Sequence, residues 1–96
     1  MQCFQQAVVL DPGLSEALNN IALIHLQEGR LDEAIGVLQA VLERSPRLAE
    51  AHYNLGRALA GKGRREEALA HLREAVRLAP SEPEPRRALR ELQRQP

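Results

Sequence analysis

The sequence contains no tryptophan and no threonine, and it has a single cysteine, Cys3. One cysteine excludes both an internal disulfide and a zinc site built from several thiolates. Polar residues interrupt the apolar stretches every few positions, too soon for a membrane-spanning helix of about 20 residues. The start of the chain also lacks the basic segment and continuous apolar core of a secretory signal. We therefore expect a soluble, cytoplasmic protein that does not associate with membranes.

An excess of charge of one sign is also missing. Thirteen basic residues balance thirteen acidic ones, so the formal net charge is zero. This balance gives no reason to expect nucleic acid or an anionic membrane as the partner. The charge is nevertheless unevenly distributed, because residues 1–48 contain three basic and six acidic side chains whereas residues 49–96 contain ten and seven. The two halves therefore carry charges of about −3 and +3.

The residues needed for catalysis or metal binding are scarce. The three serines are expected in turns or helix caps, and the scattered glycines form no phosphate-binding loop. The three histidines fall on three different predicted helices, without the i, i+4 spacing of a helical metal site. We therefore expect no enzymatic activity, no metal site and no cofactor. The residues considered are Ser15, Ser45, Ser81, His25, His52 and His71.

A period of 34 residues runs through the chain. Residues 15–48 align with residues 49–82 over their whole length without a gap. A period in this range is typical of proteins built from stacked structural repeats. The same register extends back into residues 1–12, which match the second half of a repeat. The coinciding positions are Glu16/Glu50, Ala17/Ala51, Asn20/Asn54, Gly29/Gly63, Glu33/Glu67, Ala34/Ala68, Leu38/Leu72 and Pro46/Pro80.

The local pattern within each unit predicts helices. Apolar residues in the stretch 16–27 cover more than half of a helix circumference, as expected for a helix packed on both sides. Gly29 and Gly63 stand where a left-handed residue can end a helix. Pro46 and Pro80 close each unit, because proline does not fit inside a helix. We expect helices over residues 2–10, 15–28, 31–44, 49–62, 65–78 and 83–94.

Each unit resembles a tetratricopeptide repeat. The family's Leu-Gly pair in the first helix is present as Leu55-Gly56 and, in degenerate form, as Ile21-Ala22. Acidic pairs precede the small residue that opens the second helix, at the positive end of the helix dipole. The second-helix positions of the family pattern are Asp32-Glu33 and Glu66-Glu67, Ala34 and Ala68, Leu38 and Leu72, Val41 and Ala75, and Pro46 and Pro80. Two family positions differ: its Trp is Leu18 and His52 here, and its Tyr is His25 and Leu59.

The resemblance implies an all-α fold. In this fold, antiparallel helix-turn-helix repeats stack into a right-handed superhelical α-solenoid. The last helix is mostly charged, as a solenoid requires of the helix that covers its end, and Ser81 and Glu84 predict a capping box there. We expect a single domain over residues 1–96, composed of the second half of a truncated repeat (1–12), two repeats (15–48 and 49–82) and a capping helix (83–96).

By the same resemblance, the first helices of successive repeats line a concave groove that binds an extended or helical peptide. Asn20 and Asn54 recur at the repeat period, and an amide can both donate to and accept from a peptide backbone. Their recurrence can also reflect nothing more than the frequency of asparagine at this family position. The predicted groove residues are Glu16, Asn19, Asn20, Leu23, Leu26, Gln27, Glu50, Tyr53, Asn54, Arg57, Ala60, Arg87 and Glu91.

A different groove chemistry is not expected. Tetratricopeptide co-chaperones that clamp a C-terminal carboxylate use Lys, Arg and Asn residues at five positions of the inner helices. The corresponding positions here are Asn19, Leu23, Asn54, Glu84 and Ala88, and only Asn54 matches.

The N-terminal residues Cys3, Phe4 and Val8 would normally pack on a preceding helix. We predict that they form an apolar self-association edge. The sequence thus predicts a protein–protein interaction module with a protein or peptide partner. Two alternatives stay open: a self-assembling scaffold that forms homo-oligomers through this edge, and a regulatory segment of a larger enzyme.

Overall fold

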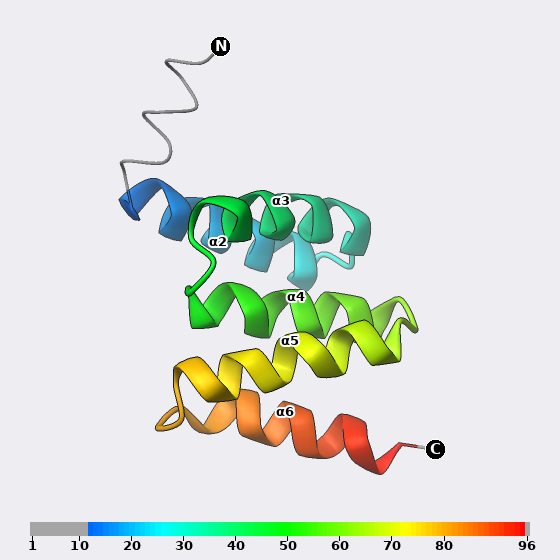
Figure 1. The fold of residues 1–96 in the computed structure, drawn as a ribbon. Helices are drawn as coiled ribbons and strands as arrows, with labels where there is room; N and C mark the ends of the chain where they lie inside the picture. Colours follow the sequence, from blue (N-terminus) through cyan, green and yellow to red (C-terminus); the bar gives the residue numbers. More distant parts are fainter. Residues whose placement is uncertain (1–11, 96) are drawn as a thin grey trace.

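The computed structural model describes residues 12–95, and within this range the chain is folded into helices joined by short turns (Figure 1). The prediction of an all-α solenoid is confirmed. Each helix begins and ends within three residues of the position that the sequence predicts. The helices are α2 (Pro12–Gln27), α3 (Leu31–Arg44), α4 (Ala49–Gly61), α5 (Arg65–Leu78) and α6 (Pro83–Arg94). The predicted helix over residues 2–10 lies outside the described range.

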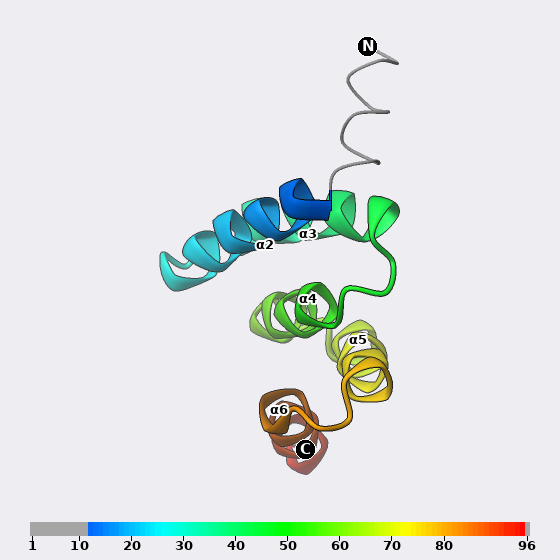
Figure 2. The ribbon, with the colours of Figure 1, turned by 90° about the vertical axis from the view of Figure 1, so that its left-hand side faces the viewer.

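Consecutive helices run antiparallel and pack against each other, and the array has two layers. Helices α2, α4 and α6 form one layer, in which α4 contacts both α2 and α6. Helices α3 and α5 form the other layer, and each packs against the helices that precede and follow it (Figure 2). The layers therefore follow the alternation that a right-handed superhelical α-solenoid of tetratricopeptide type requires.

The turns inside the two helix pairs depend on glycine. Gly29 and Gly63 have φ angles of 78° and 81°, a left-handed conformation that side chains other than glycine rarely adopt. The N–H groups of the residues that follow, Arg30 and Arg64, donate to the carbonyl oxygens five residues earlier, at 2.8 and 2.9 Å. These bonds satisfy carbonyl groups at the helix ends and reverse the chain. The predicted role of both glycines is confirmed.

The core lies between the two layers. Its fully buried side chains are mostly leucine and alanine. Gly56 shows how closely the layers approach, since a Cβ atom there would lie 2.8 Å from Cγ of Leu72 and 3.2 Å from the carbonyl oxygen of Ala68. The largest fully buried side chains are Leu38, Leu55, Leu59, Leu72 and Val41.

Arginine side chains bond to backbone carbonyl groups near both ends of helix α6. Nη2 of Arg86 donates to the carbonyl oxygen of Pro80 at 2.6 Å, before the helix begins. Nη2 of Arg65, at the start of α5, donates to the carbonyl oxygens of Leu92 and Gln95 at 3.3 and 3.4 Å. These carbonyl groups are at the C-terminal end of α6, where Leu92 also accepts from the backbone N–H of Gln95 at 3.2 Å.

Two local predictions at helix starts are wrong. The N-cap residue of α6 is Glu82 and its side chain makes no capping hydrogen bond, so the capping box from Ser81 to Glu84 does not form. Ser15 lies inside α2 and not in a turn, because the described part of this helix already includes residues 12–14.

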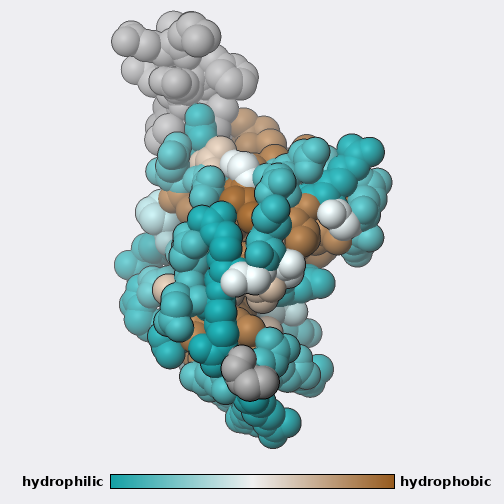
Figure 3. All heavy atoms as spheres, turned by 90° about the vertical axis from the view of Figure 1, so that its right-hand side faces the viewer, coloured by the Kyte–Doolittle hydropathy of each residue, from teal (hydrophilic) through white to brown (hydrophobic). Residues whose placement is uncertain are grey.

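The two ends of the array differ in their surfaces. Ile21 and Ile24 on α2 are 45% and 52% exposed, and they are the only exposed large apolar residues in the described part of the chain. Apolar surface gathers over the α2 and α3 end of the molecule, while the α5 and α6 end is mostly hydrophilic (Figure 3). None of the helices in residues 12–95 has both the length and the apolar character that a bilayer crossing requires.

Candidate functional site

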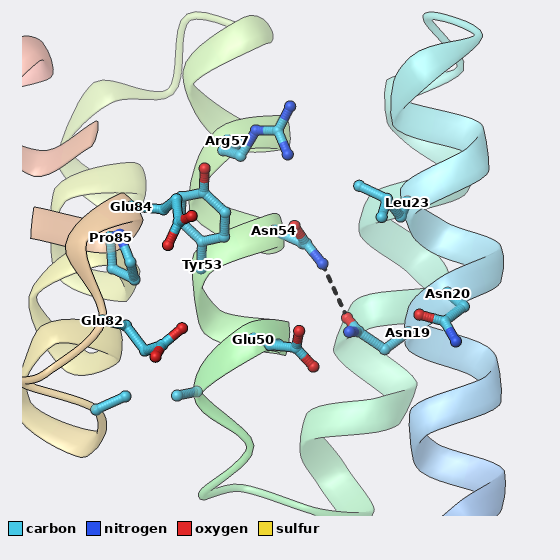
Figure 4. Close-up of a pocket in the computed structure, with 12 residues that line it drawn as sticks. Asn19, Asn20, Leu23, Glu50, Tyr53, Asn54, Arg57, Glu82, Glu84 and Pro85 are labelled. Atoms are coloured by element: carbon cyan, nitrogen blue, oxygen red, sulfur yellow. Dashed lines mark hydrogen bonds between the residues drawn. The ribbon is translucent and has the colours of Figure 1, made fainter. Parts of the chain in front are cut away.

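An open cavity of about 280 Å³ lies on the layer formed by α2, α4 and α6 (Figure 4). Its walls come from the middle of α2, from most of α4 and from the start of α6, three segments that are far apart in the sequence. We call this cavity the groove. The residues that line it are Asn19, Asn20, Leu23, Ala49, Glu50, Tyr53, Asn54, Arg57, Ala79, Glu82, Glu84 and Pro85.

The groove brings together most of the residues that the sequence places there. Glu16 lies apart from it, in a shallow depression beside Ser15 and Arg47. Gln27 and Arg87 are exposed and do not line it. The predicted residues that do line the groove are Asn19, Asn20, Leu23, Glu50, Tyr53, Asn54 and Arg57.

A buried amide pair joins α2 to α4 at the groove wall. Nδ2 of Asn54 donates to Oδ1 of Asn19 at 3.1 Å. Asn19 is 3% exposed and Asn54 is 5% exposed. The bond uses one polar atom of each amide and leaves Nδ2 of Asn19 and Oδ1 of Asn54, one donor and one acceptor, at the edge of the groove. If both side-chain amides were rotated by 180°, Asn19 would donate to Asn54. One donor and one acceptor would still remain at the groove.

The two asparagines that share a repeat position, Asn20 and Asn54, have different surroundings. Asn54 is buried against α2, whereas Asn20 is exposed. Asn54 packs against Asn19 and not against its own equivalent. A 34-residue alignment identifies equivalent positions, but neighbouring helices contact each other through non-equivalent ones.

The contribution of α6 to the groove differs from the sequence prediction. Arg87 and Glu91 were predicted to line the groove, but the residues that do so are Glu82, Glu84 and Pro85, at the start of the helix. A usable signal was present, because Glu84 follows Glu50 by one period of 34 residues. Glu91 lines a second open cavity further along α4 and α6, of about 350 Å³.

Charged side chains in the groove are mostly acidic. Glu50, Glu82 and Glu84 supply three carboxylates, while Arg57 supplies the one guanidinium in the lining. The guanidinium carbon of Arg57 lies 5.4 Å from the ring centroid of Tyr53, within the range of a cation–π contact. The aromatic ring therefore already holds the only positive charge in the groove lining.

Two of the three histidines meet away from the groove. Nδ1 of His52 lies 3.0 Å from Nδ1 of His71, and Nε2 of His52 lies 2.8 Å from the carbonyl oxygen of Pro46. Since a carbonyl can only accept, Nε2 of His52 carries the proton. Nδ1 of a neutral His52 then accepts from Nδ1–H of His71. The pair connects α4 to α5, and His25 on α2 takes no part in it.

The pKa of His71 is lowered from its ordinary value of 6.5. Burial of the ring is the main cause, and repulsion from His52 adds to it, while the carboxylates of Glu67 and Glu74 oppose the shift. The described residues contain no group of three or more potential metal ligands. The hydrogen bond between His52 and His71 links α4 to α5.

The residues predicted to form a self-association edge, Cys3, Phe4 and Val8, lie outside the described residues. Within the described range, the exposed large apolar side chains are Ile21 and Ile24 of α2.

Comparisons with known proteins agree with this architecture. The sequence profile of the tetratricopeptide repeat family matches two overlapping stretches, residues 2–49 and 19–83. Because these stretches include most of the chain, the chain belongs to the tetratricopeptide repeat family. No curated protein sequence matches it significantly. Family membership identifies a protein-interaction module on a fold that is generally a non-catalytic scaffold.

Solved structures share the fold. The chain is 36% identical to YrrB, a tetratricopeptide protein described as having an unusual peptide-binding site, over 90% of this chain and 44% of that one, with a TM-score of 0.75. It is 28% identical to the MamA RS-1 ArsTM double mutant over 93% of this chain and 50% of that one, with a TM-score of 0.77. The chain therefore spans about half the length of these two proteins.

A third structure, a tetratricopeptide repeat domain protein from Salinibacter ruber, is 24% identical and supports the fold alone. The alignment covers 86% of this chain and 89% of that chain, with a TM-score of 0.61.

Proposed function

We propose that the chain binds an extended peptide or a segment of a partner protein in the groove between α2, α4 and α6, and that it does not catalyse a reaction. The observation that supports this most directly is the amide pair at the groove wall. Asn19 and Asn54 are almost fully buried, yet each keeps one polar atom beyond their shared hydrogen bond.

A spare donor beside a spare acceptor matches the chemistry of a peptide backbone. Every peptide unit presents one N–H and one C=O group, and an extended strand uses them to bind along a surface. Buried amides are held in place before the ligand arrives, so little conformational entropy is lost on binding. YrrB, which shares the fold and 36% of its aligned sequence, is described as having a peptide-binding site.

Selection from a random peptide library, followed by calorimetric titration of the selected peptides, tests this proposal. We expect Asn20→Ala and Tyr53→Ala to weaken binding, because both residues line the groove. Gln39→Ala provides a matched amide control, since Gln39 is exposed on α3 in the other layer. Helicity measured by circular dichroism should be unchanged in all three variants. Equal binding by the groove variants and the control would contradict the proposal.

We also propose a second function, self-assembly through the α2 end of the array. Ile21 and Ile24 expose about half of their side chains on neighbouring turns of α2, and burying a large aliphatic side chain recovers about 1.5–3 kcal/mol. Cys3, Phe4 and Val8 are the further residues proposed for this edge.

Light scattering over a concentration series tests self-assembly. We expect a mass that rises with concentration, and we expect the double variant Ile21→Lys, Ile24→Lys to remain a monomer. A matched control pair, Gln39→Lys with Glu43→Lys, changes exposed residues of α3. A native chain that stays monomeric at high concentration would exclude this function and leave the groove proposal untouched.

A further inference from the structure

We propose that the segment bound in the groove is basic: an extended peptide whose arginine or lysine side chains contact Glu50, Glu82 and Glu84 while its backbone bonds to the amide pair. This inference rests on the proposed peptide-binding function and adds the chemical class of the ligand.

The three carboxylates of the groove have no cationic partner. Within residues 12–95, none of Glu50, Glu82 and Glu84 lies within ion-pair distance of a basic side chain. Arg86 is one helical turn from Glu82, but its guanidinium donates to the backbone of Pro80 instead. By contrast, the carboxylates that do form ion pairs all lie outside the groove: Glu28, Asp32, Glu66, Glu67 and Glu74.

The single cation of the groove does not neutralise these carboxylates. Arg57 is held over the ring of Tyr53, so the groove retains an excess of negative charge. Three like charges on the wall of one cavity repel each other, and a cationic ligand would relieve this repulsion. An acidic peptide would add to it. The charge of the lining therefore favours basic over acidic segments.

The buried amides supply the second, independent observation. Asn19 and Asn54 are at least nine-tenths buried, and their remaining donor and acceptor atoms stand on the groove wall. A metal ion or a small cation would leave the donor without a partner. A peptide backbone offers groups for both atoms, so the combination of amides and carboxylates specifies a basic peptide in preference to a free cation.

The arrangement of the lining gives the ligand a direction. Figure 4 places the amide pair on the side of α2 and α4, Glu82 and Glu84 on the side of α6, and Glu50 near the middle. An extended segment would therefore cross the helices of this layer, with backbone contacts at the α2 side and cationic side chains toward α6. Each carboxylate would add a partly solvated ion pair, and several such pairs together set specificity and association rate.

The test compares three labelled peptides of equal length by fluorescence anisotropy. One alternates Arg with Ala, and in the others Gln or Glu replaces Arg. We expect the Arg peptide to bind more tightly than the Gln peptide and the Glu peptide to bind most weakly. Raising the ionic strength from about 0.05 M to about 0.5 M should remove most of the difference.

A triple variant with Glu50→Gln, Glu82→Gln and Glu84→Gln should weaken Arg-peptide binding roughly tenfold, at about twofold for each exposed pair. It should leave the affinity for the Gln peptide unchanged. Glutamine keeps the shape of each side chain, and circular dichroism checks that the helices are intact.

The matched control makes the same change in net charge on the opposite layer, through Glu33→Gln, Glu43→Gln and Glu66→Gln. All three glutamates are exposed on α3 or α5. We expect it to bind the Arg peptide within about twofold of the native chain, because only screened, long-range charge is altered.

The outcomes separate this inference from the proposed function. If all three peptides bind equally and Tyr53→Ala weakens all of them, the groove binds peptides but the charge inference is wrong. If the control variant loses as much affinity as the groove variant, the effect is one of net charge and the inference is also wrong. If no peptide binds and library selection also fails, both the inference and the proposed function fall.

Discussion

The helix pairs α2–α3 and α4–α5 have matching sequences but different environments. Ile21 and Ile24 of α2 are about half exposed, whereas Leu55 and Ala58, which follow them by one period in α4, are 2% and 0% exposed. The difference does not come from hydrophobicity, because isoleucine is as apolar as leucine. It arises because α4 packs between α3 and α5, and Leu55 lies beside residues of both helices. In a stacked array, burial is set by neighbours as much as by sequence.

The largest expected effect comes from shortening the buried Leu55, compared with shortening the exposed Ile21. Leu55→Ala should lower the free energy of unfolding by about 2–5 kcal/mol, because it opens a cavity in a fully packed region. Ile21→Ala, at the equivalent position, should cost less than about 1 kcal/mol because half of the side chain is already in water. Urea unfolding followed by circular dichroism measures both. An equal loss would show that another surface covers Ile21.

The asparagines give the second test. Asn54→Ala should cost about 1–3 kcal/mol, since it removes the hydrogen bond to a buried Asn19. Asn20→Ala, one period earlier, should change stability by about 0.5 kcal/mol or less because Asn20 is exposed. The same unfolding experiment applies. Equal, small effects would mean that the amide pair contributes nothing to holding α2 against α4.

Glycines at two helix positions provide the third test. Gly56→Ala should destabilise the protein by roughly 1 kcal/mol, because the new Cβ would meet Leu72 and the Ala68 backbone, partly offset by alanine's better helix propensity. Gly36→Ala should stabilise it by about 0.5–1 kcal/mol, since Gly36 lies inside α3 with nothing within 4 Å of its would-be Cβ. A lower melting temperature for Gly56→Ala and a higher one for Gly36→Ala would confirm both predictions. A stabilising Gly56→Ala would contradict the close approach of α4 to α5.

The smallest expected effect concerns pH. His71 has a lowered pKa in the folded protein and an ordinary value near 6.5 when unfolded, so the unfolded state binds protons more readily. The contribution of neutral His71 to the stability of the folded state is therefore complete above about pH 6.5, and it is lost progressively as the pH falls below that value. The pKa values of Glu67 and Glu74 are lowered by hydrogen bonds from Arg64 and Arg77, so these carboxylates lose their contribution only at more acidic pH, below their ordinary 4.5.

His71→Gln isolates this effect, because glutamine can still donate a hydrogen bond to Nδ1 of His52 but does not titrate. We expect its melting temperature to change less than that of the native chain between about pH 7.5 and pH 5.5. The equivalent position in the first pair is Val37, which contributes no titration there. Identical pH profiles for the variant and the native chain would exclude His71 as the source.

Most of the fold could be predicted from the sequence, because it depends on local signals. Gly29, Gly63, Pro46 and Pro80 mark the turns whatever packs around them, and the 34-residue period shows that the units stack.

The groove could be predicted only in part. The alignment found its α2 and α4 walls, but it gave no information on which side chains meet across helices. The contact between Asn54 and Asn19 depends on how far α4 rotates relative to α2. The pairing of His52 with His71 depends in the same way on the approach of α5 to α4.

The arginine contacts at the two ends of α6 give that helix a double role. The helix that buries Leu92 in the core also carries Glu84 and Pro85, so α6 contributes both to the core and to one wall of the groove. Fraying of α6 would have to break the bonds from Arg65, which belongs to the preceding helix. Amide exchange in α6 should therefore slow when the groove is occupied, since a partner bound to Glu84 and Pro85 would stabilise the closed helix.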